Sequence, residues 1–290
     1  MVRRRVLAAI RAEVLPAIQQ HGPIQAWIID DTGFPKKGVH SVGVAQQCCD
    51  QLGKQENCQV AVSLSITNQH ASLHVAYRLY LPKIWAEDAA RRGKTGVPDE
   101  VGSASKPLIA LEQIRHAQRD GVPPGTVLAD AGCGVETDLR DGITALRLTY
   151  VVGIQSSASI WPPGQEPLPV KPCSGRGCPT SRVGRSADHK PFSAKDLAGR
   201  LLKDAWRRVA WRQGTNASLA SRFAAIRVSP AHRDYTAATP RPEEWCLIEG
   251  PIREAETSKS WLFTLPAATS RTRLVRHAML RCASSATTRR

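Results

Sequence analysis

The sequence predicts a mixed α/β fold, in which a sheet of parallel and antiparallel strands is flanked by helices. Three observations support this prediction. Residues 58–66 alternate between apolar and polar side chains, which is typical of a strand. Residues 107–121 begin with proline, end with glycine and carry apolar residues at helical spacing, as a crossover helix does. Two short apolar runs, at 26–29 and 125–129, have the length and composition of buried strands.

The first sixty residues begin with an amphipathic pattern over 1–20, which predicts a helix that Gly22-Pro23 ends. The run Ala26 to Asp31 then predicts a buried strand. The turn residues 34–38 follow, and the apolar stretch 42–45 predicts the second arm of a hairpin with that strand.

The middle of the chain alternates between strand and helix patterns, which is typical of an α/β sheet. In chain order we expect strands at 58–66 and 73–81, a charged loop at 82–106, a helix at 107–121, a strand at 125–129, a helix at 136–146 and a strand at 150–154.

Beyond residue 154 the composition shifts towards Pro, Gly, Ser and Arg. Between residues 171 and 212 there are eleven Lys and Arg against three Asp, at 188, 196 and 204. Apolar stretches at 222–227, 244–249 and 260–265 predict strands within this basic, β-rich insert. A last helix is expected from residue 270, with its pattern lost at Cys282.

Composition points to a globular protein with a polyanionic partner. The 290 residues are 42% hydrophobic, and 40 Lys and Arg against 25 Asp and Glu give a formal charge of +15. This charge attracts nucleic acid first and acidic membrane surfaces second. The chain has no apolar run of ~18 residues and no signal peptide pattern, so the expected location is the cytoplasm. The eight cysteines are scattered, which argues against a disulfide framework.

Two of the predicted strands end in carboxylates. Asp30 and Asp31 close the run at 26–29, and Asp130 closes the run at 125–129. Carboxylates at the end of an apolar strand require compensation, and a divalent metal such as Mg²⁺ supplies it. Alternation places Asp31 on the face of Trp27 and Ile29, which favours Asp31 over Asp30 as a ligand, although a one-residue slip would reverse the choice. A turn with solvated aspartates is the alternative.

Basic residues are the candidates for nucleic-acid contact, with a solvated loop as the alternative. Tryptophans at 161, 206 and 211 among the arginines are compatible with contacts to the DNA backbone and bases. The candidate residues are Lys36, Lys37, Arg176, Arg182, Arg185, Arg207, Arg208 and Arg212.

The motifs together resemble the DDE transposases of bacterial insertion sequences. The resemblance rests on the order of Ile-Asp-Asp-Thr-Gly-Phe-Pro-Lys-Lys-Gly, Gly-Lys-Gln, Leu-Ala-Asp-Ala-Gly, Tyr-Val-Val-Gly-Ile and Trp-Leu-x-x-Leu-Pro, from about Ile24 to Arg281. It implies an RNase H-like core, with Asp31 and Asp130 as catalytic aspartates that bind Mg²⁺ or Mn²⁺ together with Asp30. It also implies double-stranded DNA substrates, namely the terminal inverted repeats of an element and the target DNA. A homodimer in a synaptic complex, no membrane partner and association with the nucleoid are further expectations.

The resemblance also suggests a division of the chain into four parts. Residues 1–22 are an N-terminal helix, expected to be the remnant of a longer region. Residues 23–156 form the catalytic core, 157–266 the basic insertion, and 267–290 the start of the last core helix with an aberrant tail.

One expected part of the site is missing from the sequence. Transposases of this type carry a glutamate on the last helix, and Ser285 stands in its place. Deleting one G from a DNA reading frame that encodes Arg-Trp-Arg-Ile-Glu after Leu280 would shift the frame and give the observed tail from Cys282 to Arg290. We therefore expect a frameshifted, truncated and inactive product. The alternatives are a non-catalytic DNA-binding remnant and, with less support, a host RNase H-like nuclease.

Overall fold

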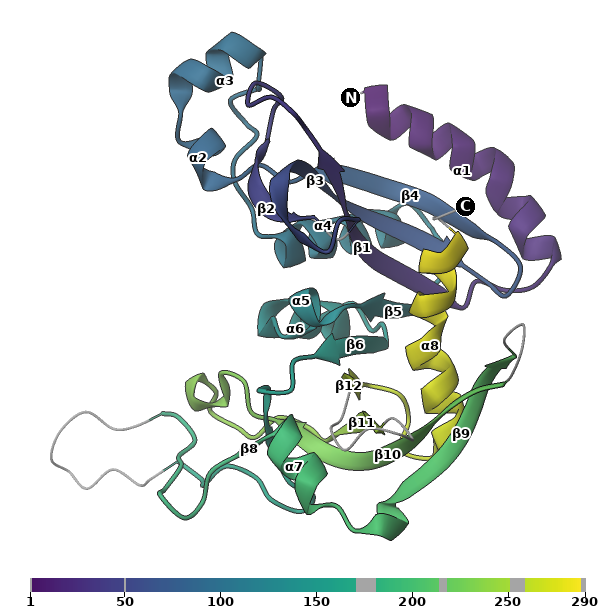
Figure 1. The fold of residues 1–290 in the computed structure, drawn as a ribbon, viewed down its shortest axis with the longest axis vertical. Helices are drawn as coiled ribbons and strands as arrows, with labels where there is room; N and C mark the ends of the chain where they lie inside the picture. The colour runs from purple at the N-terminus through teal and green to yellow at the C-terminus, as the bar shows by residue number, and fades with distance from the viewer. Residues whose placement is uncertain (1, 50, 171–180, 214–217, 251–258, 288–290) are drawn as a thin grey trace, which may run out of the picture. The chain divides into compact units, whose positions relative to one another are not determined.

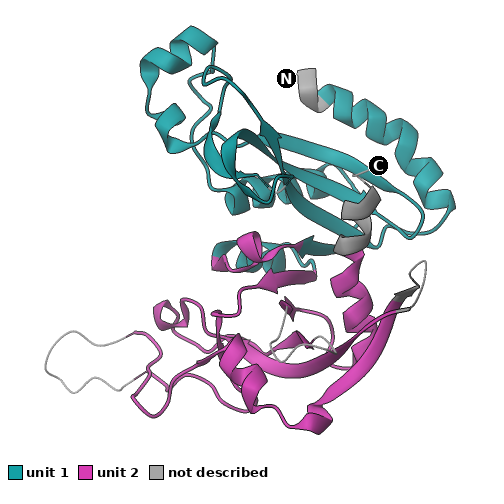
Figure 2. Cartoon of the chain, viewed as in Figure 1, with its two compact units in different colours: residues 1–128, 138–148 teal, residues 129–137, 149–290 magenta. Residues whose placement is uncertain are grey.

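The structure of the chain is a computed structural model that describes residues 2–49, 51–170, 181–213, 218–250 and 259–287. The chain forms two compact units (Figure 2). Unit 1 contains residues 1–128 and 138–148, and unit 2 contains residues 129–137 and 149–290. In both units the sheet is accompanied by helices (Figure 1).

The sheet of unit 1 is mixed. Its strands are β1 (Ala26–Pro35), β2 (Ala45–Cys49), β3 (Lys54–Thr67), β4 (Ser72–Leu79) and β5 (Thr126–Ala129). The strand order is β2-β3-β1-β5, with β4 also paired to β3. β1 runs antiparallel to β3 and parallel to β5. The expected strands at 58–66, 73–81 and 125–129 are confirmed.

The expected hairpin between the first strand and residues 42–45 is wrong. β1 continues through the expected turn to Pro35 and pairs with β3 over its whole length, while β2 also pairs with β3. The tight turn lies instead between β2 and β3, where Gly53 has φ +64° and its N–H, like that of Leu52, donates to the carbonyl of Cys49. A glycine adopts this backbone conformation without steric cost, so the hairpin forms there.

The helices of unit 1 include two that the sequence patterns did not predict. α1 (Val2–Gln20), α4 (Lys106–Arg119) and α6 (Thr137–Ala145) were expected, but residues 82–106, expected as a loop, contain α2 (Lys83–Ala86) and α3 (Ala89–Thr95). α3 is defined by its caps rather than by an apolar stripe. The Asp88 carboxylate accepts from the Arg91 N–H, and Gly96 ends the helix with φ +65°.

The core of unit 1 lies between the sheet and α4. Trp27, Ile29 and Leu64 are buried on one face of the sheet, and Ile114 of α4 is fully buried. The Gln113 side chain of α4 donates to the carbonyl of Val62 on β3. α4 therefore covers the face to which Trp27 and Ile29 point.

Unit 2 contains the β-rich region that the sequence predicted. Its strands are β6 (Tyr150–Ile154), β7 (Ser159–Trp161), β8 (Phe192–Ser193), β9 (Trp206–Gln213), β10 (Ser218–Pro230), β11 (Glu244–Gly250) and β12 (Lys259–Phe263). Their order is β6-β12-β11-β10-β7-β8, with β9 on β10. The short helical elements are α5 (Ala131–Gly134), α7 (Ala194–Arg200), η1 (Lys203–Ala205) and η2 (Asp234–Thr236).

The last helix, α8 (Arg271–Thr287), forms as the apolar pattern predicts. Leu274, Val275, Ala278 and Met279 are all buried. The helical backbone continues past Cys282, where the sequence pattern was expected to be lost. The chain thus has a mixed α/β fold with a large mixed sheet flanked by helices, consistent with an RNase H-like fold.

Candidate active site

The first acidic motif closes the buried part of β1. Trp27 anchors the strand, because its indole N–H donates to the carbonyl of Pro123 at 2.8 Å. Ala26, Trp27, Ile28 and Ile29 are all buried, and the strand becomes half-buried at Asp30 and Asp31. The two carboxylates therefore stand where the apolar strand leaves the core.

Asp30 and Asp31 lie on opposite faces of β1. Asp31 is paired in register with Val62, on the face that α4 covers, and its carboxylate forms an ion pair with Lys106 at the start of α4. The Asp31 side chain is 21% exposed and that of Lys106 is 28% exposed. Asp31 therefore has a cation of its own chain beside it, which the sequence alone did not reveal.

Asp30 is paired in register with Ser63, on the other face of the sheet. That face carries a polar group around His74, whose Nδ1 lies 2.6 Å from the Ser65 hydroxyl. The His74 and Tyr77 rings lie 4.8 Å apart between centroids. Burial lowers the pKa of His74, and the nearby charge of Asp30 opposes this shift. Burial therefore makes His74 less readily protonated than an exposed histidine.

The parallel pairing of β1 with β5 relates the two acidic motifs. Trp27 pairs with Val127, and Ile28 pairs with Leu128. In the sequence, Asp30 follows Ile28 by two residues, and Asp130 follows Leu128 by two residues. The two motifs thus leave parallel strands at the same offset. Asp130 is assigned to unit 2, and the separation of the carboxylates stays a prediction.

The second acidic motif is held by close backbone packing within unit 2. The Asp130 carboxylate accepts from the Cys133 N–H at 3.0 Å and so caps the short helix α5. A Cβ at Gly134 would lie 2.1 Å from the Gly153 carbonyl oxygen of β6, and a Cβ at Gly153 would lie 2.8 Å from the Ala131 nitrogen. Only glycine fits at these two positions, and the contact fixes the backbone that carries Asp130.

The expected place of the third carboxylate is in α8. Ser285 belongs to the helical backbone of that element, and its side chain lies outside the described residues. Within the described ranges, no group of three or more His, Cys, Asp or Glu side chains has the arrangement of a metal site.

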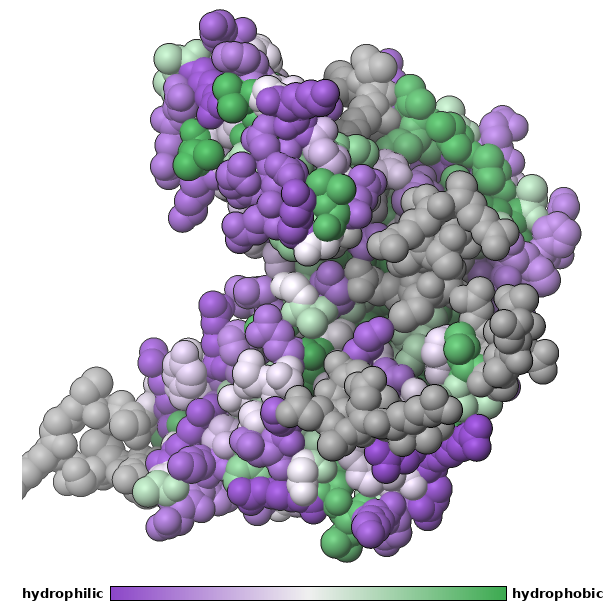
Figure 3. Space-filling view, in the orientation of Figure 1, coloured by the Kyte–Doolittle hydropathy of each residue, from purple (hydrophilic) through white to green (hydrophobic). Residues whose placement is uncertain are grey.

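The basic residues nominated for DNA contact fall into different settings. Lys36 and Lys37 are exposed just after β1, and Arg182, Arg207 and Arg208 are exposed in unit 2. Hydrophilic side chains cover much of the face shown in Figure 3. The Arg207 guanidinium donates to the carbonyls of Asp204 and Trp206. Arg185 is bound to Asp234. Arg176 lies outside the described residues, as does the side chain of Arg212 on β9.

Sequence reasoning missed Lys106, although a signal was present. Lys106 stands in the first turn of α4, directly after the N-cap Ser105. A cation at this position interacts unfavourably with the helix dipole, and a nearby anion such as Asp31 offsets that cost. A basic residue at a predicted helix start is therefore a reason to look for a carboxylate partner.

Comparisons with known proteins place the chain in a family. A family model described as DDE superfamily endonuclease matches residues 3–218. The curated relative "Probable transposase for insertion sequence element IS701" from Microchaete diplosiphon is 29% identical over 154 residues, which is 52% of this chain. The match covers only 37% of that relative's length.

Solved structures were matched as well, among them the NurA nuclease from Sulfolobus solfataricus. The match covers 97% of this chain and 83% of the nuclease, at 8% identity and a TM-score of 0.31, which is too low to support an argument. No helix among the described residues has the length and apolarity needed to cross a membrane. From the family model, which spans most of the sequence, we conclude that this chain belongs to the DDE superfamily endonucleases.

Proposed function

We propose that this chain is the catalytic part of a DNA transposase, an enzyme class that cleaves phosphodiester bonds and transfers strands of an insertion sequence, and that its own cleavage activity is weak or lost. The parallel pairing of β1 with β5 carries the proposal, because it gives two acidic motifs the same offset from adjacent strands. Carboxyl ends of parallel neighbours meet at one edge of a sheet, and residues at equal offsets follow the same alternation. The family assignment and the named transposase relative support the same reaction class.

The donor set fits a hard divalent cation. Asp130 and a carboxylate of the Asp30-Asp31 pair would hold Mg²⁺ or Mn²⁺ through oxygen ligands. The equal offset favours Asp30, whereas Asp31 has Lys106 as its own cation. The metal, when bound, activates the attacking oxygen and stabilises the leaving oxygen of a phosphodiester. The protein's own contribution is the position of these carboxylates, which Trp27 secures on β1 and Gly153 beside α5.

The proposed partner is double-stranded DNA, first as the terminal inverted repeats of the element and then as the target. The net charge of +15 favours a polyanion, and several arginines and lysines are exposed in both units. A homodimer in a synaptic complex and association with the nucleoid are parts of the same proposal. The name of the relative also refers to a transposase of an insertion sequence.

The second candidate function is a DNA-binding transposase remnant that does not cut. The residue identity at position 285 favours it, because a serine cannot replace the charge of a glutamate in holding a second cation. We propose that strand cleavage by this chain is weak or undetectable for that reason, and that a frameshift in the last helix is its origin.

A plasmid nicking assay with Ser285→Glu tests both candidates. If position 285 holds the missing carboxylate, the S285E variant nicks supercoiled DNA in Mg²⁺ or Mn²⁺, while the unchanged chain does not. The double variant S285E/D130N, which differs in one carboxylate, should lose the gained activity by at least two orders of magnitude. Strong nicking by the unchanged chain would overturn the inactivity, and equal nicking by both variants would overturn the assigned site. DNA binding without nicking by S285E would favour the remnant.

A further inference from the structure

The loop between β1 and β2, residues 36–44, is held through its carbonyl groups by side chains that lie outside it. The Asn57 amide donates to the carbonyls of Lys36 and Gly38, at 2.7 and 2.9 Å. Gln59 donates to a further loop carbonyl at 2.6 Å. Both donors stand on β3, so the strand that pairs with β1 and with β2 also fixes the loop that joins them.

Arg91 of α3 holds the 36–44 loop as well (Figure 1). Its guanidinium donates to the carbonyl of Val39 at 2.6 Å and lies 3.9 Å from the ring centroid of Trp85. The indole N–H of Trp85 donates to the carbonyl of Val44 at 2.7 Å. Two contacts thus fix the Arg91 side chain, and they place its positive charge at the loop.

The N–H groups of the 36–44 loop have few partners within the protein. Those of Lys36 and Val44 donate to carbonyls of the chain, at 2.8 and 3.1 Å. For the N–H groups of residues 37–43, no acceptor occurs among the residues that the structure describes. Residues 36–41 are exposed. Exposed N–H groups on a backbone that is fixed through its carbonyls are suited to bind phosphate oxygens.

Lys36 and Lys37 supply further positive charge at the loop. Both are exposed, and within the described ranges no carboxylate forms an ion pair with either ammonium group. Glu56, which precedes Asn57 in the chain, is paired with Lys54 at 3.0 Å. The two loop lysines are therefore available to an anionic partner from solution.

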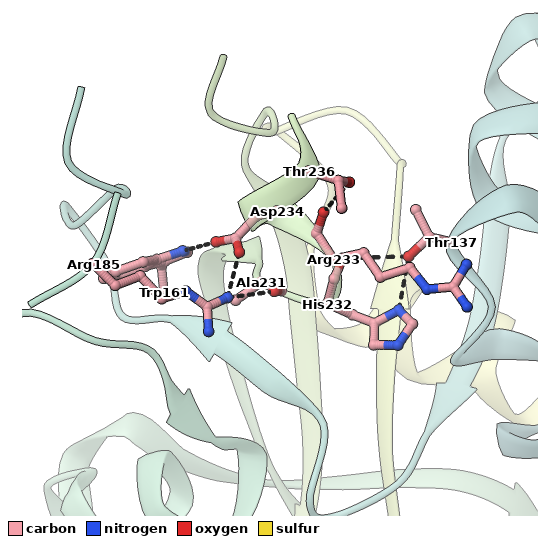
Figure 4. Close-up of polar contacts among 8 residues, drawn as sticks. All are labelled: Thr137, Trp161, Arg185, Ala231, His232, Arg233, Asp234 and Thr236. Carbon is pink, nitrogen blue, oxygen red and sulfur yellow. Dashed lines mark hydrogen bonds and ion pairs between the residues drawn. The ribbon is translucent and has the colours of Figure 1, made fainter. Parts of the chain in front are cut away.

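The buried carboxylate of unit 2 shows how a basic residue loses this availability. Arg185 forms an ion pair with Asp234, which is 1% exposed (Figure 4). Asp234 also accepts from the Trp161 indole N–H at 2.6 Å, and Arg185 donates to the carbonyl of Ala231 at 2.8 Å. The charge of Arg185 is thus compensated inside unit 2, and the lysines of the 36–44 loop are the better candidates for contact with a phosphate.

We infer that the 36–44 loop binds a backbone phosphate of DNA beside the cleavage site. The exposed N–H groups of residues 37–41 donate to the phosphate oxygens, and Lys36, Lys37 and Arg91 supply the positive charge. Because Asn57 and Arg91 hold the backbone before DNA arrives, less entropy is lost on binding. The inference rests on the proposed function in one respect, namely that the substrate is DNA.

Strand β1 sets the distance between this loop and the first acidic motif. Lys36 follows Asp31 by five residues. A strand rises about 3.3 Å per residue, so the two positions lie roughly 17 Å apart along β1. The DNA duplex rises about 3.4 Å per base pair. The phosphate at the loop therefore lies about five base pairs from the one at the acidic motif.

The first test compares Lys36→Gln/Lys37→Gln with Lys83→Gln/Lys94→Gln. Each double variant loses two exposed lysines of unit 1, but Lys83 and Lys94 lie on α2 and α3. Binding of a labelled duplex is measured by fluorescence anisotropy at several salt concentrations, without divalent metal. We expect K36Q/K37Q to bind roughly tenfold or more weakly at low salt, with a log–log salt slope lower by about two. K83Q/K94Q should stay within about twofold of the unchanged chain.

Asn57→Ala tests the held backbone without changing the charge. The variant removes both hydrogen bonds to the loop and leaves every lysine and arginine in place. We expect it to bind duplex roughly threefold to tenfold more weakly, because the loop is less ordered before binding, and to keep the salt slope of the unchanged chain.

Hydrogen exchange measured by mass spectrometry tests the backbone contacts on the unchanged chain, so its result does not depend on the stability of a variant. Without DNA, the peptide that covers residues 36–44 should exchange rapidly. Saturating duplex should slow that exchange roughly tenfold or more, while the amides of α3 change little. Unchanged exchange in this peptide while DNA is bound would overturn the inference, as would equal affinity and slope in K36Q/K37Q and K83Q/K94Q.

This outcome is separable from failure of the proposed function, because neither measurement needs metal or cleavage. Nicking by S285E without slowed exchange in the 36–44 loop would leave the reaction standing and overturn the loop as a DNA contact. Slowed exchange without nicking by S285E would support the loop and favour the DNA-binding remnant.

Discussion

Asp30 and Asp31 are consecutive residues on opposite faces of β1, so each has a different environment and only one face can hold the first metal ligand. Asp31 is compensated by Lys106, and Asp30 lies on the polar face with Ser63 and His74. The equal offset of Asp30 and Asp130 from the β1–β5 register argues for Asp30. The alternation in the sequence had favoured Asp31, because it places Asp31 on the same face as the buried core residues of β1. The sequence does not show that α4 covers that face.

We predict that Asp30→Asn weakens Mn²⁺ binding at least tenfold, because a lost carboxylate ligand removes both charge and coordination. Asp31→Asn should change the affinity less than threefold. Isothermal titration with Mn²⁺ measures both variants, with Asp130→Asn as the positive control. A larger loss in D31N than in D30N would reverse the assignment and return the site to the α4 face.

At the scale of secondary structure, the glycine contact between α5 and β6 is the feature that positions Asp130. Gly153 and Gly134 allow two backbone segments to approach more closely than any side chain permits. The sequence contains both glycines, but their contact is seen only in the folded structure, where α5 lies against β6.

Gly153→Ala should destabilise the protein by about 2–4 kcal/mol, because the new Cβ would meet backbone atoms that cannot rotate away. Gly199→Ala is the matched control, since Gly199 lies in α7 and has nothing within 4 Å of its ideal Cβ. Alanine there should stabilise by about 0.5–1 kcal/mol through helix propensity. Urea unfolding measures both changes, and equal stability of the two variants would show that the close contact is not maintained in solution.

The elements that the sequence predicted are those whose own pattern was strong. β3 alternates between apolar and polar side chains over residues 58–66, and α4 and α8 have apolar stripes that the core buries. α2 and α3 were missed, because helices of four and seven residues are too short to show a helical periodicity, and only α3 has a capping side chain. The partner of β1 was mistaken because local turn residues at 34–38 suggested a hairpin, whereas the long strand β3 offered a better pairing surface. The partner of Asp234 could not be predicted, since Arg185 is distant in sequence, and Lys106 could be suspected from its place at a helix start without its partner being identified.

For the whole molecule, the excess of positive charge is the property on which the proposed DNA binding depends. The count of 40 basic against 25 acidic residues is a sequence property, and exposure of basic side chains in each unit agrees with an electrostatic role. Composition alone gives this expectation of DNA binding, because surface charge requires no particular pairing of strands.

Duplex DNA binding by the unchanged chain should weaken by roughly 10³-fold or more between ~50 and ~200 mM salt, if about six phosphates are neutralised. Anisotropy titrations with a duplex of unrelated sequence measure the slope. The matched variant R207A/R208A, which removes two exposed arginines of β9, should reduce the slope by about two. Affinity that does not change across this range would show that the basic surface is only solvated.

The pairing of β6 with β12 has a consequence for the order in which the protein is made. Ile154 pairs with Ser260, and all of β7 to β11 lies between these strands in the chain. A ribosome must therefore synthesise those intervening strands before β6 can acquire this neighbour, and during that time the β6 edge is open to wrong partners. Closing such a long loop before its contacts form is slow. We accordingly expect refolding of unit 2 to be slow, and chains released before β12 to aggregate through that open edge.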